Sequence, residues 1–161
     1  MATVYLFCGL PGSGKTTFAR DLERRLSAVR FTLDHRMLAK YELTIFDDEY
    51  GHLARTEKDA IWKEAQDALR SGRDVVLDWS LWSRKSRLEW TEKVVRSGHA
   101  YKLLFFQVPL SELKLRLAKR NSDASALAHE IPLDKLEDFS HVFEVPRMDE
   151  GIPFDVIASD G

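Results

Sequence analysis

The chain has 161 residues, of which 44% are hydrophobic and 31% are charged, enough apolar material for the core of one domain with a well-solvated surface. Its 24 basic and 26 acidic residues leave a net charge of -2, so there is no global attraction to polyanions and a long nucleic-acid partner is not indicated. Cys8 is the only cysteine, which excludes an internal disulfide, and the N-terminal apolar run is too short for a signal peptide or a membrane span. We therefore interpret the protein as cytoplasmic, with no membrane partner and with its oligomeric state undetermined.

A short apolar run at residues 3–8 precedes the sequence Gly-Leu-Pro-Gly-Ser-Gly-Lys-Thr at residues 9–16. This octet has the pattern GxxxxGK[ST] of a phosphate-binding loop, which connects a strand to a helix. Behind it, Phe18, Leu22 and Leu26 recur at helical spacing, so strand, loop and helix stand in the order that the motif requires. The sequence therefore predicts a site for a nucleoside triphosphate.

The residue types of this loop suit a polyphosphate. Backbone N–H groups converge on an anion only where side chains are absent, and the glycines of the loop leave that space. Lys15 is expected to reach the β- and γ-phosphates of ATP as a point charge, and the Thr16 hydroxyl is expected to ligate Mg²⁺. We assign nucleotide contacts to eight residues of the segment, namely Gly9, Pro11, Gly12, Ser13, Gly14, Lys15, Thr16 and Thr17.

The rest of the chain alternates between strand and helix patterns. In chain order, the predicted elements are a strand at 29–33, an irregular stretch at 38–51, a helix at 55–70, a strand at 75–77, a helix at 83–98, a strand at 101–108, a helix opened by Pro109, a mobile polar segment at 121–128, a helix at 133–143 and a strand at 154–157. This alternation predicts an α/β domain spanning residues 1–161, with helices on both faces of a parallel sheet. Ligands of such sheets bind at the carboxyl ends of the strands.

Two carboxylates are expected at that edge of the sheet. Asp34 follows the second predicted strand and Asp78 follows the third. We assign Asp78 to the nucleotide's Mg²⁺, generally through water, together with Thr16. Asp34 is then left to accept the proton of an attacking hydroxyl. The alternative for either residue is a helix N-cap or a surface carboxylate.

Arg116 and Arg120 are four residues apart and share one face of the helix that Pro109 opens. Placed over the γ-phosphate, they would offset charge in the transition state, and we assign both to nucleotide binding and catalysis. We interpret residues 116–132 as a lid that brings them in. The alternative is a solvated basic stripe shared with neighbouring lysines.

Aromatic and basic side chains follow the third strand. Trp79 and Trp82 bracket the acceptor side of the predicted site, where they either stack on a substrate ring or pack the following helix onto the sheet. Arg87, on the first part of that helix, is the better placed of its arginines to contact substrate or phosphate.

The sequence resembles the small P-loop kinases of the group that holds polynucleotide 5′-hydroxyl kinase, gluconate kinase, chloramphenicol phosphotransferase and zeta toxins. The likeness covers nearly the whole chain. It is carried by residues 9–16, by the run Val-Val-Leu-Asp-Trp-Ser at 75–80 with Arg87 downstream, and by Arg116 and Arg120 as matches to the lid arginines.

This resemblance implies a three-layer α/β/α P-loop NTPase fold like that of the nucleoside monophosphate kinases. It implies a five-stranded parallel sheet of order 2-3-1-4-5, a helical lid, and phosphoryl transfer from ATP to a hydroxyl. It also implies that Val145 and Pro146 belong to the segment that wraps the adenine. Arg36 takes the place of the basic residue that meets the acceptor's phosphate in polynucleotide kinases, although it stands one position early.

Three functions are compatible with this pattern. The leading hypothesis is an ATP- and Mg²⁺-dependent kinase acting on a hydroxyl of a small molecule, such as an antibiotic or a nucleoside-like compound. The second is a polynucleotide or nucleoside 5′-hydroxyl kinase. It is disfavoured by the shifted position of Arg36 and by Leu81, which stands where related kinases often have Asn. The third is a nucleotide-gated binding module without transfer activity.

Overall fold

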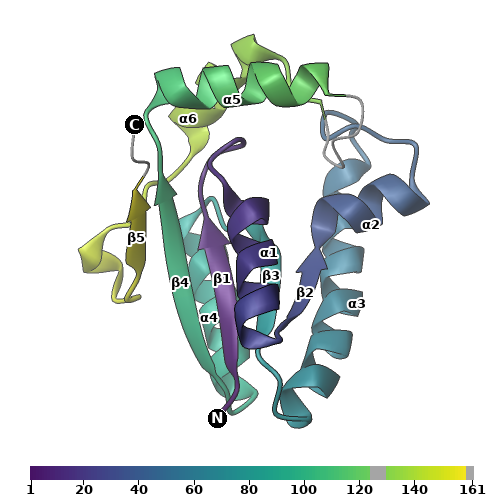
Figure 1. Cartoon of the computed structure of the whole chain (residues 1–161), viewed down its shortest axis with the longest axis vertical. Helices are drawn as coiled ribbons and strands as arrows, with labels where there is room; N and C mark the ends of the chain where they lie inside the picture. Colours follow the sequence, from purple (N-terminus) through teal and green to yellow (C-terminus); the bar gives the residue numbers. More distant parts are fainter. Residues whose placement is uncertain (124–129, 159–161) are drawn as a thin grey trace.

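The computed structural model describes residues 1–123 and 130–158, and its centre is a sheet of five parallel strands in the order β2-β3-β1-β4-β5 (Figure 1). The order implied by the resemblance is confirmed. The strands are β1 (Thr3–Cys8), β2 (Val29–Thr32), β3 (Val75–Ser80), β4 (Ala100–Gln107) and β5 (Asp155–Ala158). The helices are α1 (Lys15–Leu26), α2 (Leu33–Lys40), α3 (Tyr50–Arg70), α4 (Arg84–Arg96), α5 (Leu110–Ser122), α6 (Leu133–Val142) and the short 3₁₀ helix η1 (Met148–Glu150). In the described part of the chain, no helix has the length and apolar character needed to cross a membrane.

Helices cover both faces of the sheet, because successive side chains of a strand point to opposite sides. On one side, Leu6 of β1 belongs to a buried cluster with Ile61 of α3 and Trp90 of α4. On the other side, Phe7 belongs to a second buried cluster with Leu22 of α1. The alternation along one strand therefore produces the predicted three-layer α/β/α architecture (Figure 1).

Helices α5 and α6 form an arch over the carboxyl edge of the sheet (Figure 1). They have a small core of their own, made by Leu113, Leu117 and Leu136 together with Ile131. The start of the predicted lid, at residue 116, therefore lies on α5. The segment predicted to be mobile, 121–128, begins inside this helix, and its residues 124–128 lie outside the described residues.

Three boundaries differ from those predicted. Asp34 does not end a strand: it lies in the first turn of α2, where an acidic side chain is favourable near the positive end of the helix dipole. The stretch predicted as irregular, 38–51, is helical at its two ends, at 38–40 in α2 and 50–51 in α3, because Met37 and Ala54 anchor these helices in the main core. Strand β3 continues beyond Leu77, since Asp78 pairs in register with Thr32 of β2.

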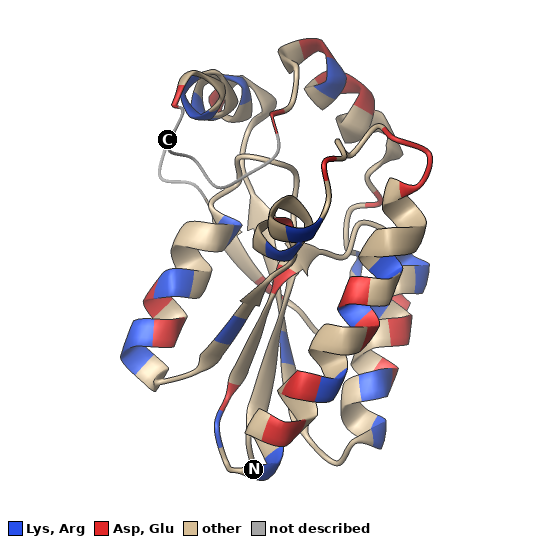
Figure 2. Ribbon diagram, turned by 90° about the vertical axis from the view of Figure 1, so that its right-hand side faces the viewer, with Lys and Arg blue, Asp and Glu red and all other residues tan. Residues whose placement is uncertain are grey.

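Charged side chains of both signs alternate along the helices (Figure 2). This distribution agrees with the small net charge of the chain. The charges with the largest effect on stability are therefore expected among the buried ones.

The most deeply buried ion pair lies between Arg87 of α4 and Glu150 of η1, whose side chains are 0% and 4% exposed. Arg87 Nη2 donates to Glu150 Oε1 at 2.6 Å and Nε donates to Oε2 at 3.0 Å. Its Nη1 donates to the carbonyl of Leu81 at 3.1 Å. The structure therefore corrects the expected contact of Arg87 with substrate, because its guanidinium is fully engaged in joining α4 to the segment before β5.

We predict that Glu150→Gln lowers the free energy of unfolding by about 3 kcal/mol, because it leaves the buried guanidinium without a countercharge. Urea denaturation monitored by circular dichroism measures this loss. Asp67→Asn, which breaks an exposed pair with Arg70, is the matched control and should change stability little. A Glu150→Gln protein as stable as this control would contradict the structural role of the pair.

Candidate functional site

The loop between β1 and α1 has the backbone shape of an anion cradle. Gly12 and Gly14 have φ angles of +83° and +95°, which side-chain-bearing residues rarely adopt. A Cβ on Gly9 would lie 2.8 Å from Ser13 Oγ and 3.0 Å from Phe106 Cβ. A side chain at any of the three glycines would therefore distort the loop, which fits the expectation of a phosphate site.

Ser80, at the end of β3, holds the start of the loop. Its Oγ donates to the Gly9 carbonyl at 2.7 Å and accepts from the Gly9 N–H at 2.9 Å. The next residue, Leu81, donates its N–H to the carbonyl of Phe7 at 2.9 Å. The loop thus begins from a position fixed by the neighbouring strand, a role for Ser80 that sequence reasoning missed.

The ammonium of Lys15 lies inside the cradle. Its Nζ donates to the carbonyl of Leu10 at 2.8 Å, to that of Gly9 at 3.2 Å and to Ser13 Oγ at 3.2 Å. Burial lowers the pKa of Lys15 to about 8, although the carboxylates of Asp78 and Asp34 act in the opposite direction. The cation is therefore held by neutral oxygens, and a polyanion in the loop would stabilise its charged form.

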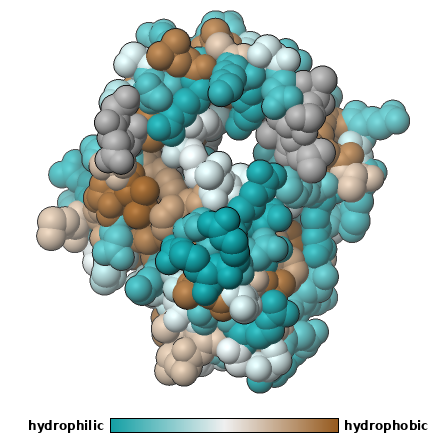
Figure 3. Space-filling model, in the orientation of Figure 1, coloured by the Kyte–Doolittle hydropathy of each residue, from teal (hydrophilic) through white to brown (hydrophobic). Residues whose placement is uncertain are grey.

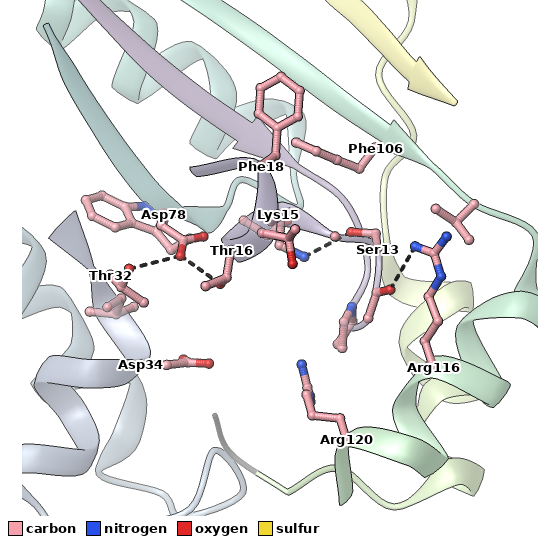
Figure 4. A pocket seen from close by; sticks show the side chains of 18 of the residues that line it. Ser13, Lys15, Thr16, Phe18, Thr32, Asp34, Asp78, Phe106, Arg116 and Arg120 are labelled. Atoms are coloured by element: carbon pink, nitrogen blue, oxygen red, sulfur yellow. Dashed lines mark hydrogen bonds between the residues drawn. The ribbon is translucent and has the colours of Figure 1, made fainter. Parts of the chain in front are cut away.

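Asp78 connects the loop to β2. Its Oδ2 accepts from Thr16 Oγ1 at 2.7 Å and from Thr32 Oγ1 at 3.0 Å (Figure 4). A carboxylate beside a hydroxyl is an oxygen pair suited to Mg²⁺, which usually completes its coordination with water and substrate phosphates. In the described part of the chain no group of three or more acidic, histidine or cysteine side chains could hold a metal alone. The donor set therefore fits a magnesium ion that arrives with the nucleotide.

Asp34 and the two arginines of α5 complete the site. Figure 4 shows Asp34 from α2 and Arg120 from α5 pointing into the space in front of Lys15 and Thr16. Burial lowers the pKa of Arg120, and the charge of Asp34 opposes this shift. Arg116 Nη1 donates to the Gly12 carbonyl at 3.4 Å, and its Nε donates to Glu112 Oε1 at 3.1 Å.

These groups line one cavity of about 1480 Å³. Figure 3 shows the molecule hollowed between the arch and the body below it. The volume exceeds that of an ordinary single-ligand pocket, so it has room for a nucleotide and a second substrate. Thirteen of the predicted site residues line it: Pro11, Gly12, Ser13, Gly14, Lys15, Thr16, Thr17, Asp34, Asp78, Trp79, Trp82, Arg116 and Arg120.

Four further predicted contacts do not lie in the lining: Gly9, which is the first residue of the loop, and Arg36, Val145 and Pro146. Arg36 pairs with Glu64 of α3 at 2.6 Å and lies over the ring of Phe31, 5.7 Å from its centroid. Val145 is 53% exposed and Pro146 is buried, and neither is among the cavity residues. The structure therefore does not support the expected contacts of Arg36, Val145 and Pro146 with ligands.

Both tryptophans line the cavity and also pack against other rings. Trp79 is 7% exposed and meets Trp90 edge-on, with centroids 5.2 Å apart. Trp82 meets Phe139 of α6 edge-on at 5.2 Å. Each ring is therefore fixed by packing, and each presents part of its surface to the cavity.

Sequence reasoning missed two lining residues of α3, Tyr50 and Lys58. Burial and the Asp34 carboxylate raise the pKa of Tyr50, so its phenol stays protonated. Tyr50 lies in the stretch predicted as irregular, and Lys58 reads as one more polar residue of an amphipathic helix. No local signal distinguishes either of them.

The family model for the AAA domain matches residues 4–146, which is most of the chain. The chain belongs to the AAA domain family. Its fold is that of the small P-loop kinases, as the sequence predicted, and this fold implies nucleotide binding. A search of curated proteins finds no match to this AAA domain.

Solved structures with the same fold include a chain of an RNA repair complex, a gluconokinase and Kti12. A chain of the Pnkp1/Rnl/Hen1 RNA repair complex matches with a TM-score of 0.71 and 23% identity over 88% of this AAA domain, which spans only 43% of that chain. A gluconokinase from Sinorhizobium meliloti 1021 matches with a TM-score of 0.65 and 18% identity, covering 99% and 83% of the two chains. Kti12 of Chaetomium thermophilum, in complex with ADP-AlF3, matches with a TM-score of 0.66 and 18% identity, covering 98% and 89%.

We predict that nucleotide binding at pH 9 is accompanied by uptake of about one proton, because Lys15 is largely neutral there when the loop is empty and charged beside phosphate. Affinity should therefore fall as pH rises above 8, by up to about tenfold per unit. Calorimetric titration with an ATP analogue in two buffers of different ionisation enthalpy measures the uptake. Lys15→Arg, which is protonated throughout, should show none, and a wild-type heat independent of buffer would overturn the assignment.

Proposed function

We propose that the protein transfers the γ-phosphoryl group of ATP to a hydroxyl of a small molecule, such as an antibiotic or a nucleoside-like compound. One observation carries the proposal. A single cavity is lined by the phosphate cradle with Lys15 and by Asp34 of α2 (Figure 4). Its volume accommodates both reactants.

On the donor side, the loop N–H groups and Lys15 would bind the triphosphate, and Arg116 and Arg120 would approach it from α5. Thr16 and Asp78 would hold Mg²⁺, which supplies positive charge to the β- and γ-phosphate oxygens when bound. We also propose that residues 116–132 serve as a lid of this single domain, with its start on α5 and residues 124–129 outside the described residues.

On the acceptor side, Asp34 would accept the proton of the attacking hydroxyl. The oxygen–phosphorus bond to the acceptor forms as the bond between the γ-phosphorus and its bridging oxygen breaks, and ADP leaves. Lys15, Arg116 and Arg120 would offset the charge that develops on the transferred group. The chain thus contributes positioning and charge, which is most of what phosphoryl transfer requires.

The position of Arg36 favours the first of the two kinase hypotheses. Its ion pair with Glu64 keeps the guanidinium away from the cavity, so it does not offer the acceptor-phosphate contact that a polynucleotide substrate would need. The likeness to a chain of the RNA repair complex concerns the fold alone. The small-molecule hypothesis is therefore preferred.

A mass-spectrometric screen of metabolite, nucleoside and antibiotic pools for the gain of one phosphoryl group identifies the acceptor. For that acceptor, we predict that Asp34→Asn lowers kcat by about 10² to 10⁴-fold, because the general base is lost. Calorimetry should show nucleotide affinity nearly unchanged.

Asp48→Asn, in the exposed loop before α3, is the matched control and should keep wild-type turnover. Ordinary turnover by Asp34→Asn would refute the general-base role. Slow hydrolysis that no acceptor accelerates would instead favour a nucleotide-gated binding module.

A further inference from the structure

The proposed mechanism does not use the charge of Lys58, a residue of α3 that lines the cavity. The other basic residues described in the lining belong to α1 or α5, whereas Lys58 belongs to α3. Its Nζ lies over the ring of Trp79, 5.8 Å from the centroid. Lys58 and Trp79 both line the cavity, so this ammonium lies beside the space in which the reactants would bind.

The ammonium of Lys58 has no carboxylate within 4.0 Å among residues 1–123 and 130–158. The acidic residues on either side of it in sequence bind elsewhere: Glu57 accepts from Lys40 at 2.9 Å, and Asp59 pairs with Lys93 at 3.7 Å. Burial lowers the pKa of Lys58, with Arg55 adding to the shift and Glu89 opposing it. A cation–π contact at this distance replaces only part of the lost hydration.

The position of Lys58 separates it from the donor's phosphates. Lys15, Arg116 and Arg120 lie around the loop, whereas α3 packs beside α2 on the β2 side of the sheet (Figure 1). Asp34 of α2 lies on this same side, across the cavity from Arg116 (Figure 4). The proposed acceptor side of the cavity therefore has a carboxylate on α2 and a half-buried ammonium on the neighbouring helix α3.

This pair of opposite charges orients a substrate. An anionic group on the acceptor is repelled by Asp34 and attracted by Lys58, so it binds away from the reacting hydroxyl. The ring of Trp79 adds apolar surface beside the ammonium in the same lining.

We propose that Lys58 binds a carboxylate or phosphate-ester oxyanion of the acceptor, so that the protein selects hydroxyl compounds carrying a second, anionic group. As a statement about phosphoryl transfer, this rests on the function proposed above. As a statement about binding, it is tested without turnover.

The test measures dissociation constants, by calorimetry and tryptophan fluorescence with MgADP present, for matched pairs of hydroxyl compounds. The carboxylate pairs are D-gluconate with D-glucitol and 4-(hydroxymethyl)benzoate with 4-(hydroxymethyl)benzamide. The phosphate pair is uridine 3′-phosphate with uridine. At least one anionic member is expected to bind about tenfold or more tightly than its neutral partner, as for one charge-assisted hydrogen bond. Preference within the carboxylate or the phosphate pairs identifies which oxyanion is recognised.

Lys58→Met is expected to abolish the preference and to leave the affinity for MgADP unchanged. Lys58→Arg, which keeps the charge, should retain most of it, and Lys63→Met, on an exposed position of the same helix, should retain all of it. The arginine variant and the wild-type comparison keep the test decisive if the methionine variant does not fold.

Two results would overturn the proposal: no anionic probe that binds more tightly than its neutral partner, or a preference that survives in Lys58→Met. Transfer of the phosphoryl group is scored separately by mass spectrometry. A Lys58-dependent preference without any transfer would keep the oxyanion site and remove the kinase proposal. Transfer without such a preference would keep the kinase and remove the oxyanion site.

Discussion

The carboxylate of Asp78 is the contact on which the rest of the site depends. It accepts from Thr16 at the start of α1 and from Thr32 at the end of β2, so one side chain joins three neighbouring elements at the carboxyl edge of the sheet. Thr32 is also the N-cap residue of α2, and Asp34 lies in the first turn of that helix, two residues further along the chain. The proposed metal site therefore adjoins the short segment, Thr32 to Asp34, that carries the proposed general base.

The charges of the cavity are divided between its two sides. Basic side chains of the loop and α5 lie opposite Asp34 and Asp78 (Figure 4). Burial lowers the pKa of Lys15 and Arg120, so their charged forms are less stable without a bound anion than with one. Lys58 of α3 adds a further cation to the lining. A triphosphate on one side and an anionic hydroxyl compound on the other would balance this arrangement.

Local sequence patterns predicted most of the fold. They also predicted those parts of the site whose residues are close together in the sequence. The loop was recognisable because its glycines, Lys15 and Thr16 are adjacent, and the lid arginines because a helix repeats every 3.6 residues. Arg36 and Arg87 were misassigned because their partners, Glu64 and Glu150, are distant in sequence and only folding brings them together. Asp34 was predicted to lie at the cavity, and it lines it, but it was assigned to the wrong element. Leu33, the apolar residue before it, fits the alternation of the predicted strand and the first turn of a helix equally well.

The Mg²⁺ dependence of nucleotide binding tests the central claim most directly. The dissociation constant of a non-hydrolysable ATP analogue would be measured by calorimetry with Mg²⁺ and with EDTA, for the wild type and for Asp78→Asn. The account predicts that Mg²⁺ tightens binding to the wild type by at least about tenfold and that Asp78→Asn loses most of this gain. Equal affinities with and without Mg²⁺ in the wild type, or an undiminished gain in Asp78→Asn, would contradict it.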